Sequence, residues 1–303
     1  MQYILPGISV GGQYALIAVG YTLVYGILRL INFAHGDVFM VGGLLMVYTA
    51  ASLPLFVAIP IVVVLIVLIG FSIERVAYKP LRQAPRMSVM ISAIGVSYLL
   101  QNLALYITGG LNQNYPAIPW ISDSINIFGI DTKRVTVITP ILVIALVIGL
   151  VWLIHHTKVG IAMRAVAKDF ETSQLMGIKI NTVISTTFVI GSFLAAIGSI
   201  LFFSNYPGVI PTAGAMPGMK SFVAAVFGGI GSIPGAVLGG LIIGICESLI
   251  KGGDTIFGPD GLRFLQTSWE MATFSDAFTF VLLIVVLVFK PTGLFGEKAV
   301  DKV

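Results

Sequence analysis

The sequence predicts an all-α polytopic membrane protein, a single domain over residues 1–303 with about eight transmembrane segments, one of them a broken or re-entrant pair. Only 10% of the 303 residues are charged, against roughly 25% in soluble domains. Hydrophobic residues make up 57% of the chain, and the mean hydropathy is +1.01. Several charge-free windows are long enough for a membrane helix of about 20 residues. These features argue against a soluble enzyme and a disordered protein.

Apolar runs separated by polar or Pro-containing breaks define the segments before the middle of the chain. A basic loop with Pro80 and Pro85 follows the third run, and proline there stops a helix. A loop over residues 109–134, rich in Gly, Pro, Asn and Asp, follows the fourth run. We expect the first five segments at residues 3–28, 38–52, 53–73, 88–108 and 137–155.

The second half begins with a polar, helix-compatible stretch at residues 158–179 and continues with membrane segments at 182–205 and 277–289. Between these segments lies an apolar run, residues 220–250, which contains the sequence Gly228-Gly-Ile-Gly-Ser-Ile-Pro-Gly235. One proline and four glycines within eight residues disfavour an uninterrupted helix. We therefore predict two short helices joined at this break, entering and leaving on the same side.

The distribution of Lys and Arg predicts the orientation, because cytoplasmic loops are enriched in these residues. The loop after the third segment and the 158–179 stretch are assigned to the cytoplasm, as is the C-terminus. The cytoplasmic loop contains Arg75, Lys79, Arg82 and Arg86. The outer side is assigned Lys133, Arg134, Lys220, Lys251 and Arg263.

Residues 158–179 have the pattern of an amphipathic helix. Met163, Val166, Ala167 and Phe170 recur at helical spacing on one face. The pattern is compatible with a helix lying on the lipid headgroups. The alternative is a helix that docks into a groove of a partner protein.

Four stretches together resemble one family over nearly the whole chain. Glu171-Thr-Ser-Gln-Leu-Met-Gly177 resembles the cytoplasmic EAA loop of ABC importer permeases, with Thr172 and Ser173 where alanine is usual. The other three resemble the LivH/LivM type of branched-chain amino acid permease, and the LivH half in particular. They are Gly26-Ile-Leu-Arg-Leu-Ile-Asn-Phe-Ala-His-Gly-Asp37, Arg164-Ala-Val-Ala-Lys-Asp169 and Gly228-Gly-Ile-Gly-Ser-Ile-Pro-Gly-Ala-Val-Leu-Gly-Gly240.

The resemblance implies a multi-pass permease in the bacterial cytoplasmic (inner) membrane, without its own ATPase site, cofactor or metal. Its expected partners are membrane lipid, a second, LivM-like permease, two cytoplasmic ABC ATPases and an external substrate-binding protein; no nucleic acid is expected. The permease would form half of a pathway for branched-chain or related amino acids. A coupling helix at about 160–178 would sit in an ATPase cleft, with Gly177 ending it as a left-handed cap. The coupling residues are expected to be Arg164, Lys168, Asp169, Glu171 and Gly177.

Polar residues within or between the apolar runs are candidates for the substrate pathway: Asn32, His35, Gln13, Ser92 and Gln101. Ionisable groups at membrane depth are costly and usually functional. Asn32 and His35 could instead belong to a short, solvated cytoplasmic turn that also holds Arg29 and Asp37.

The alternative function is a secondary transporter or channel for a small solute. A secondary transporter would need membrane-buried carboxylates for ion coupling, and none is convincing in the sequence. Glu247, the one carboxylate in a long apolar run, is expected near the outer interface. Strips of small residues, such as Gly240, Gly244 and Ser248, predict close helix packing, either within the chain or between permeases.

Overall fold

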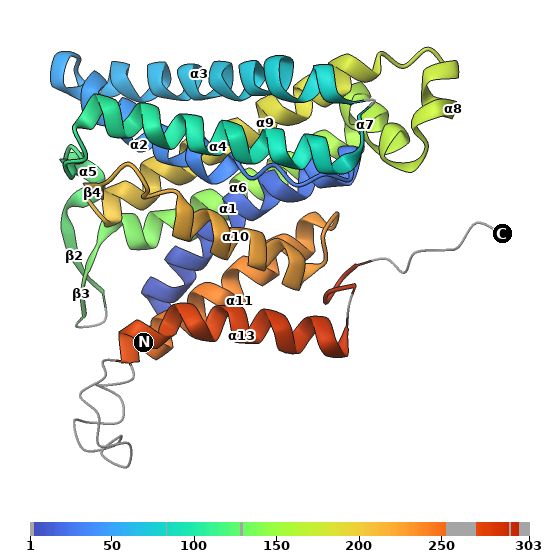
Figure 1. Ribbon diagram of the computed structural model, residues 1–303. Coiled ribbons are helices and arrows are strands. Elements are labelled where there is room, and N and C mark those ends of the chain that lie inside the picture. Colours follow the sequence, from blue (N-terminus) through green and yellow to red (C-terminus); the bar gives the residue numbers. More distant parts are fainter. Residues whose placement is uncertain (1–2, 83, 128–129, 253–270, 291, 297–303) are drawn as a thin grey trace.

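The computed structural model describes residues 3–82, 84–127, 130–252, 271–290 and 292–296, and this part of the chain is almost entirely helical (Figure 1). The predicted all-α class is therefore confirmed. Of the described helices, 6 are long and apolar enough to cross a membrane. They are α1 (Ile4–Leu28), α3 (Leu55–Ile73, continuing through short turns to Leu81), α4 (Arg86–Thr108), α6 (Arg134–His156), α9 (Ile180–Asn205) and α11 (Ile233–Lys251).

The remaining elements are shorter or less apolar. Three helices lie among the long ones: α2 (His35–Ser52), α10 (Ala215–Gly228) and α13 (Met271–Phe289). The helices α5 (Pro119–Ser122), α7 (Lys158–Lys168) and α8 (Phe170–Leu175) lie in connections. Two antiparallel pairs complete the described chain: β1 (Gln113–Asn114) with β4 (Gly208–Val209), and β2 (Ser124–Ile127) with β3 (Ile130–Lys133).

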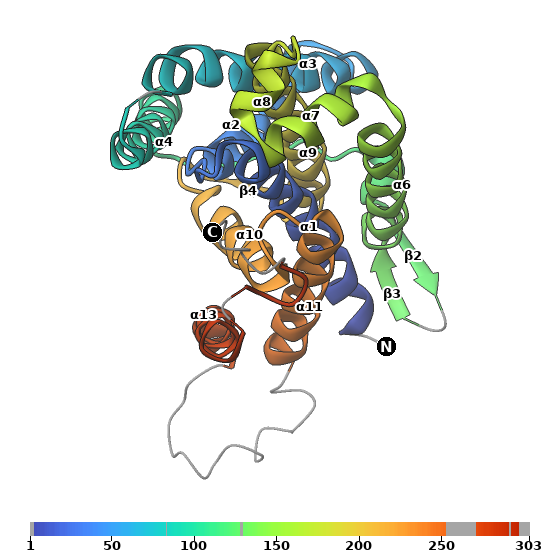
Figure 2. The same cartoon turned by 90° about the vertical axis from the view of Figure 1, so that its right-hand side faces the viewer.

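Helix α1 lies in the interior and contacts α6, α9, α10 and α11 (Figure 2). Small residues permit the closest of these contacts: a Cβ atom on Gly11 would lie 2.8 Å from the carbonyl oxygen of Gly240, and one on Gly240 would lie 2.7 Å from the backbone nitrogen of Ala15. The strip that begins at Gly240 therefore serves packing within the chain, which was one of the two predicted uses. Neither backbone leaves room for a larger side chain.

The helices α3, α4 and α6 lie at the periphery and present large apolar side chains outward (Figure 2). Phe56 is 78% exposed, Tyr106 85% and Ile148 64%. Such surfaces are compatible with lipid or with other membrane subunits, but not with water.

The predicted break between residues 228 and 235 is confirmed, although the two helices differ in length. Gly229 and Gly231 adopt φ values of +103° and +101°, and Ser232 caps α11 by accepting a hydrogen bond from the backbone nitrogen of Gly235 at 3.2 Å. The expectation of two short helices is wrong for α11, which has 19 residues, because its helix continues to Lys251; α10 has 14.

The two ends of the molecule differ in structure. Helices α7 and α8 lie at one end, and the β2–β3 hairpin lies at the other with the beginning of α1 (Figure 1). Lys133 ends β3 and Arg134 begins α6, so both lie at the hairpin end; the side of the membrane that this end faces stays a prediction. Lys220, also assigned to the outer side, lies inside α10 and is 4% exposed. Arg263 lies outside the described residues.

Candidate functional site

The expected single helix at about 160–178 is two helices. Thr157 caps α7 by accepting a hydrogen bond from the backbone nitrogen of Gly160 at 3.1 Å. Met163 and Val166 on α7 are buried, as the predicted apolar face requires. Asp169 then adopts an extended conformation (φ −152°, ψ 112°) and its side chain caps α8. Because the chain turns at Asp169, Phe170 does not continue the apolar face and is exposed.

Helix α8 is short and projects at the end of the molecule (Figure 1). Its C-terminus is closed by Gly177, whose φ is +81°, and by a hydrogen bond of 3.1 Å from the nitrogen of Ile178 to the oxygen of Ser173. This is the left-handed helix end that was predicted at Gly177. The five predicted coupling residues all lie on α7, α8 or their ends, and all five are exposed: Arg164, Lys168, Asp169, Glu171 and Gly177.

Two apolar residues at the tip of α8 were missed by the sequence analysis. Leu175 is 87% exposed and Met176 is 79% exposed. Both lie inside the EAA-like stretch, and two large apolar residues before a helix-ending glycine are a signal that the sequence offers. An apolar tip beside the exposed Glu171 has the composition of a protein-docking surface.

Asn32 in the turn between α1 and α2 is buried, as are His35 and Asp37 at the beginning of α2, so the solvated-turn alternative is wrong for these three residues; Arg29 is exposed. The side-chain oxygen of Asn32 accepts a hydrogen bond of 2.9 Å from the hydroxyl of Tyr78. The ring of His35 lies edge-on to Tyr21, with centroids 5.0 Å apart. Tyr78, in the extension of α3, contacts Asn32, and Phe222 of α10 lies against Phe33 with ring centroids 6.3 Å apart. The apolar-run pattern carries no information about such contacts.

Asp37 joins α2 to the peripheral helix α4. Its carboxylate accepts hydrogen bonds from the hydroxyl of Ser97 at 2.5 Å and from the amide of Gln101 at 3.0 Å. Both donors are neutral and half-buried. Among the described residues, no cation is paired with Asp37.

The five predicted pathway residues do not form one site. Asn32 and His35 share the buried turn, and Gln101 reaches Asp37 from α4. Ser92 donates instead to the backbone oxygen of Ala77 at 3.2 Å. Gln13 is fully buried in α1, and its amide atoms have no hydrogen-bond partner within the described part of the chain.

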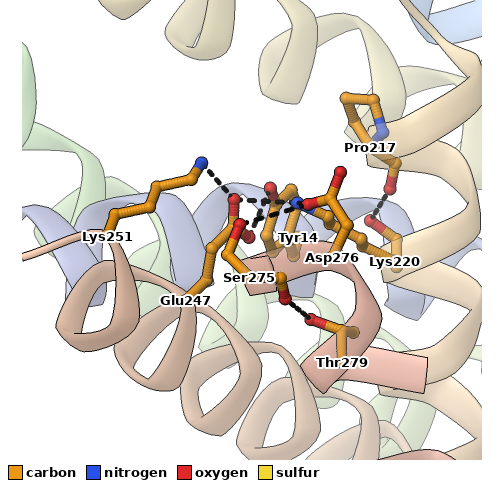
Figure 3. Close-up of polar contacts among 9 residues, drawn as sticks. Tyr14, Pro217, Lys220, Glu247, Lys251, Ser275, Asp276 and Thr279 are labelled. Carbon is orange, nitrogen blue, oxygen red and sulfur yellow. Dashed lines mark hydrogen bonds and ion pairs between the residues drawn. The ribbon is translucent and has the colours of Figure 1, made fainter. Parts of the chain in front are cut away.

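A second polar cluster joins the four helices α1, α10, α11 and α13 (Figure 3). Glu247 of α11 accepts hydrogen bonds from Lys220 of α10 at 2.8 Å, Lys251 at 2.5 Å and the hydroxyl of Tyr14 of α1 at 2.9 Å. Lys220 also pairs with Asp276 of α13 at 2.5 Å. Glu247 and Lys220 are buried, whereas the side chains of Lys251 and Asp276 are about half exposed.

The sequence predicts no convincing buried carboxylate of the kind that ion coupling in a secondary transporter needs. The structure corrects that expectation. Glu247 is 3% exposed, Asp37 is 3% exposed and Glu74 is fully buried. The partners of Glu247 lie 27 and 233 positions away in the sequence, so local patterns could not reveal them. The usable signal was that Lys220 and Glu247 each interrupt a long apolar run.

Comparisons with known proteins agree with the resemblance drawn from the motifs. The family model described as branched-chain amino acid transport system / permease component matches residues 3–287. The high-affinity branched-chain amino acid transport system permease protein BraD of Pseudomonas aeruginosa is 40% identical, covering 100% of this chain and 98% of BraD. LivH of Escherichia coli is 38% identical over 100% of this chain and 97% of LivH. A probable LivH of Methanocaldococcus jannaschii is 29% identical over 93% of this chain and 88% of its own length.

Proposed function

We propose that this chain forms half of the translocation pathway of an ATP-driven importer. The premise is that the chain belongs to the permease family of branched-chain amino acid transport systems. Its substrates are leucine, isoleucine, valine or related amino acids. It acts with a second, LivM-like permease, two cytoplasmic ABC ATPases and an external binding protein. The observation that best supports this function is the exposed tip of α8, which lies within the EAA-like stretch.

In this proposal α7 and α8 face the cytoplasm and α8 docks in a groove of one ATPase. The apolar side chains of Leu175 and Met176 supply buried area, and Glu171 supplies charge complementarity. Closure of the ATPases on ATP moves α7 and α8 as one body and switches the pathway between outward and inward access. The chain itself binds and positions, and ATP hydrolysis occurs in the partners.

The proposed arrangement in the inner membrane has eight segments. Five segments are the helices α1, α3, α4, α6 and α9. The other three are α2, α13 and the α10–α11 pair, which counts as one segment. The half-buried Ser97 and Gln101 are the best candidates to face the pathway, since Asn32, His35 and Gln13 are covered by neighbouring helices.

Co-purification and transport measurements test this function together. The chain is expected to co-purify with two ATPases and a second permease, and the reconstituted complex should import radiolabelled leucine only with ATP. Glu171→Lys should abolish both ATPase binding and uptake, whereas Asp131→Lys, an exposed charge reversal at the other end, should leave both unchanged. Uptake that persists without ATP and collapses with a protonophore would instead support a secondary transporter. The observation that favours it is Asp37, a buried carboxylate that is paired with no cation among the described residues.

A further inference from the structure

A buried ion pair lies where α3 ends, near the cytoplasmic helices. Glu74 begins a π-helical turn (Glu74–Tyr78) that extends α3, and its carboxylate is fully buried. One carboxylate oxygen pairs with Arg82, and the other accepts a hydrogen bond of 2.7 Å from the hydroxyl of Ser185. A buried carboxylate with a guanidinium and a hydroxyl as partners is fully satisfied, and breaking such a set is costly.

The same ion pair reaches the beginning of α9. Arg82 also donates to the side-chain oxygen of Asn181, which is one helical turn before Ser185. Asn181 follows Gly177, the residue that ends α8, by only four positions. The planar guanidinium can bind a carboxylate and an amide at once, which an ammonium group does less well. The end of α3 and the beginning of α9 are thus held together directly after α8.

A cavity lies beside Phe170, at the beginning of α8. It has a volume of about 240 Å³ and is lined by Phe170, the first residue of α8, together with Ile27, Leu28, Leu30, Tyr78, Arg82 and Val89. Helix α8 contacts α7 and α9, so a movement of α8 can reach the membrane helices through these two elements.

The π-helical turn connects this ion pair to the buried α1–α2 turn. Tyr78 ends the π-helical turn, donates a hydrogen bond to Asn32, and packs against Phe188 of α9 with ring centroids 5.1 Å apart. Isolated π-helical turns are frequently found at functional positions.

We propose that Glu74 and Arg82 are positioning residues for energy coupling: they hold the beginning of α9 to the end of α3, so that a movement of α8 is passed to the α1–α2 turn. This inference rests on the proposed function, since it presupposes that α8 is moved by an ATPase. It assigns to Arg82 a mechanical task in addition to its contribution to membrane orientation.

The test uses the complete importer in proteoliposomes and measures leucine imported per ATP hydrolysed. Arg82→Gln should lower this ratio by about 10-fold, within the roughly 5- to 150-fold range of typical coupling between sites. ATP hydrolysis and the amount of assembled complex should stay near the wild-type level. Arg75→Gln is the matched control. It removes the same charge from an exposed residue of the same helix extension, next to Glu74. Equal ratios in the two variants would overturn the inference.

Two further variants guard against a folding defect. Asn181→Ala removes one acceptor of Arg82 at an exposed position and should lower the ratio by several-fold without loss of protein. The Glu74→Gln/Arg82→Gln double variant should be no worse than the worse single variant, because both changes break one interaction. Additive effects would refute the pairing. If the wild-type complex binds no ATPase, the proposed function itself fails. If the wild-type complex works and Arg82→Gln imports as much leucine per ATP as wild type, only the inference about Glu74 and Arg82 fails.

Discussion

Replacing Lys220 by methionine should destabilise the protein more than any single change to an exposed charge. At 2.8 Å between Lys220 Nζ and Glu247 Oε1, Coulomb's law with an effective dielectric constant of about 20 gives a gross attraction of about 6 kcal/mol. Desolvation of the two ions offsets much of this attraction. Removing one partner of a buried pair costs about 3–5 kcal/mol, since the other charge stays buried. Glu247 keeps Lys251 and Tyr14 as partners, so we expect a loss of about 3 kcal/mol, the lower end of that range.

The assay is the free energy of unfolding of the purified chain in mixed micelles, by denaturant titration followed by helix content. Lys251→Met is the matched control: it removes a lysine from the same carboxylate, but its side chain is 46% exposed, so about 0–1 kcal/mol should be lost. The Lys220→Met/Glu247→Met double variant should be less destabilised than Lys220→Met alone, because neither charge is left unpaired. A Lys220→Met variant as stable as Lys251→Met would refute the reasoning.

Three other predictions concern separate contacts. Tyr78→Phe should cost about 1–3 kcal/mol of unfolding free energy because it leaves the buried oxygen of Asn32 without its donor; an unchanged unfolding curve would contradict this. Asp37→Ala should release α4, seen as faster hydrogen exchange of α4 amides than in a Tyr98→Ala control on the exposed face, and equal exchange would argue against the contact. Gly240→Leu should prevent accumulation of folded protein, whereas Gly95→Leu, where a Cβ would meet no atom within 4 Å, should be tolerated; similar yields would exclude close α1–α11 packing.

The long helices could be predicted from the sequence because their cause is local. Charge-free apolar runs placed α4 at 88–108 and α6 at 137–155, against observed bounds of Arg86–Thr108 and Arg134–His156. The bilayer requires such runs, so length and hydropathy alone indicate them. The break at Asp169 had a local signal as well, since an aspartate three positions before Thr172 is a typical helix cap. The continuous apolar spacing from Met163 to Phe170 concealed it.

The polar clusters could not be predicted because their partners are distant in the sequence. Glu74 meets Ser185 across 111 positions, and Asp37 meets Gln101 across 64. Such pairs depend on which helix faces are adjacent, and a strongly apolar helix gives little indication of its own orientation. The basic residues were interpreted through the positive-inside rule, which places loops but does not distinguish an exposed Arg75 from a paired Arg82.

The kind of partner each buried carboxylate has indicates where the helices can separate during transport. Glu247 of α11 is paired with Lys220 of α10, so parting these two helices would leave unpaired charges at a cost of about 3–5 kcal/mol. The Glu74–Arg82 pair lies within the extension of α3, so parting α3 from α9 would break only the hydrogen bonds to Ser185 and Asn181. Asp37 contacts α4 only through the neutral donors Ser97 and Gln101. Hydrogen bonds to a charged group contribute about 1.5–3 kcal/mol, and a pathway water can replace a neutral donor. Alternating access should therefore separate α4 from α2, while α10 and α11 move together.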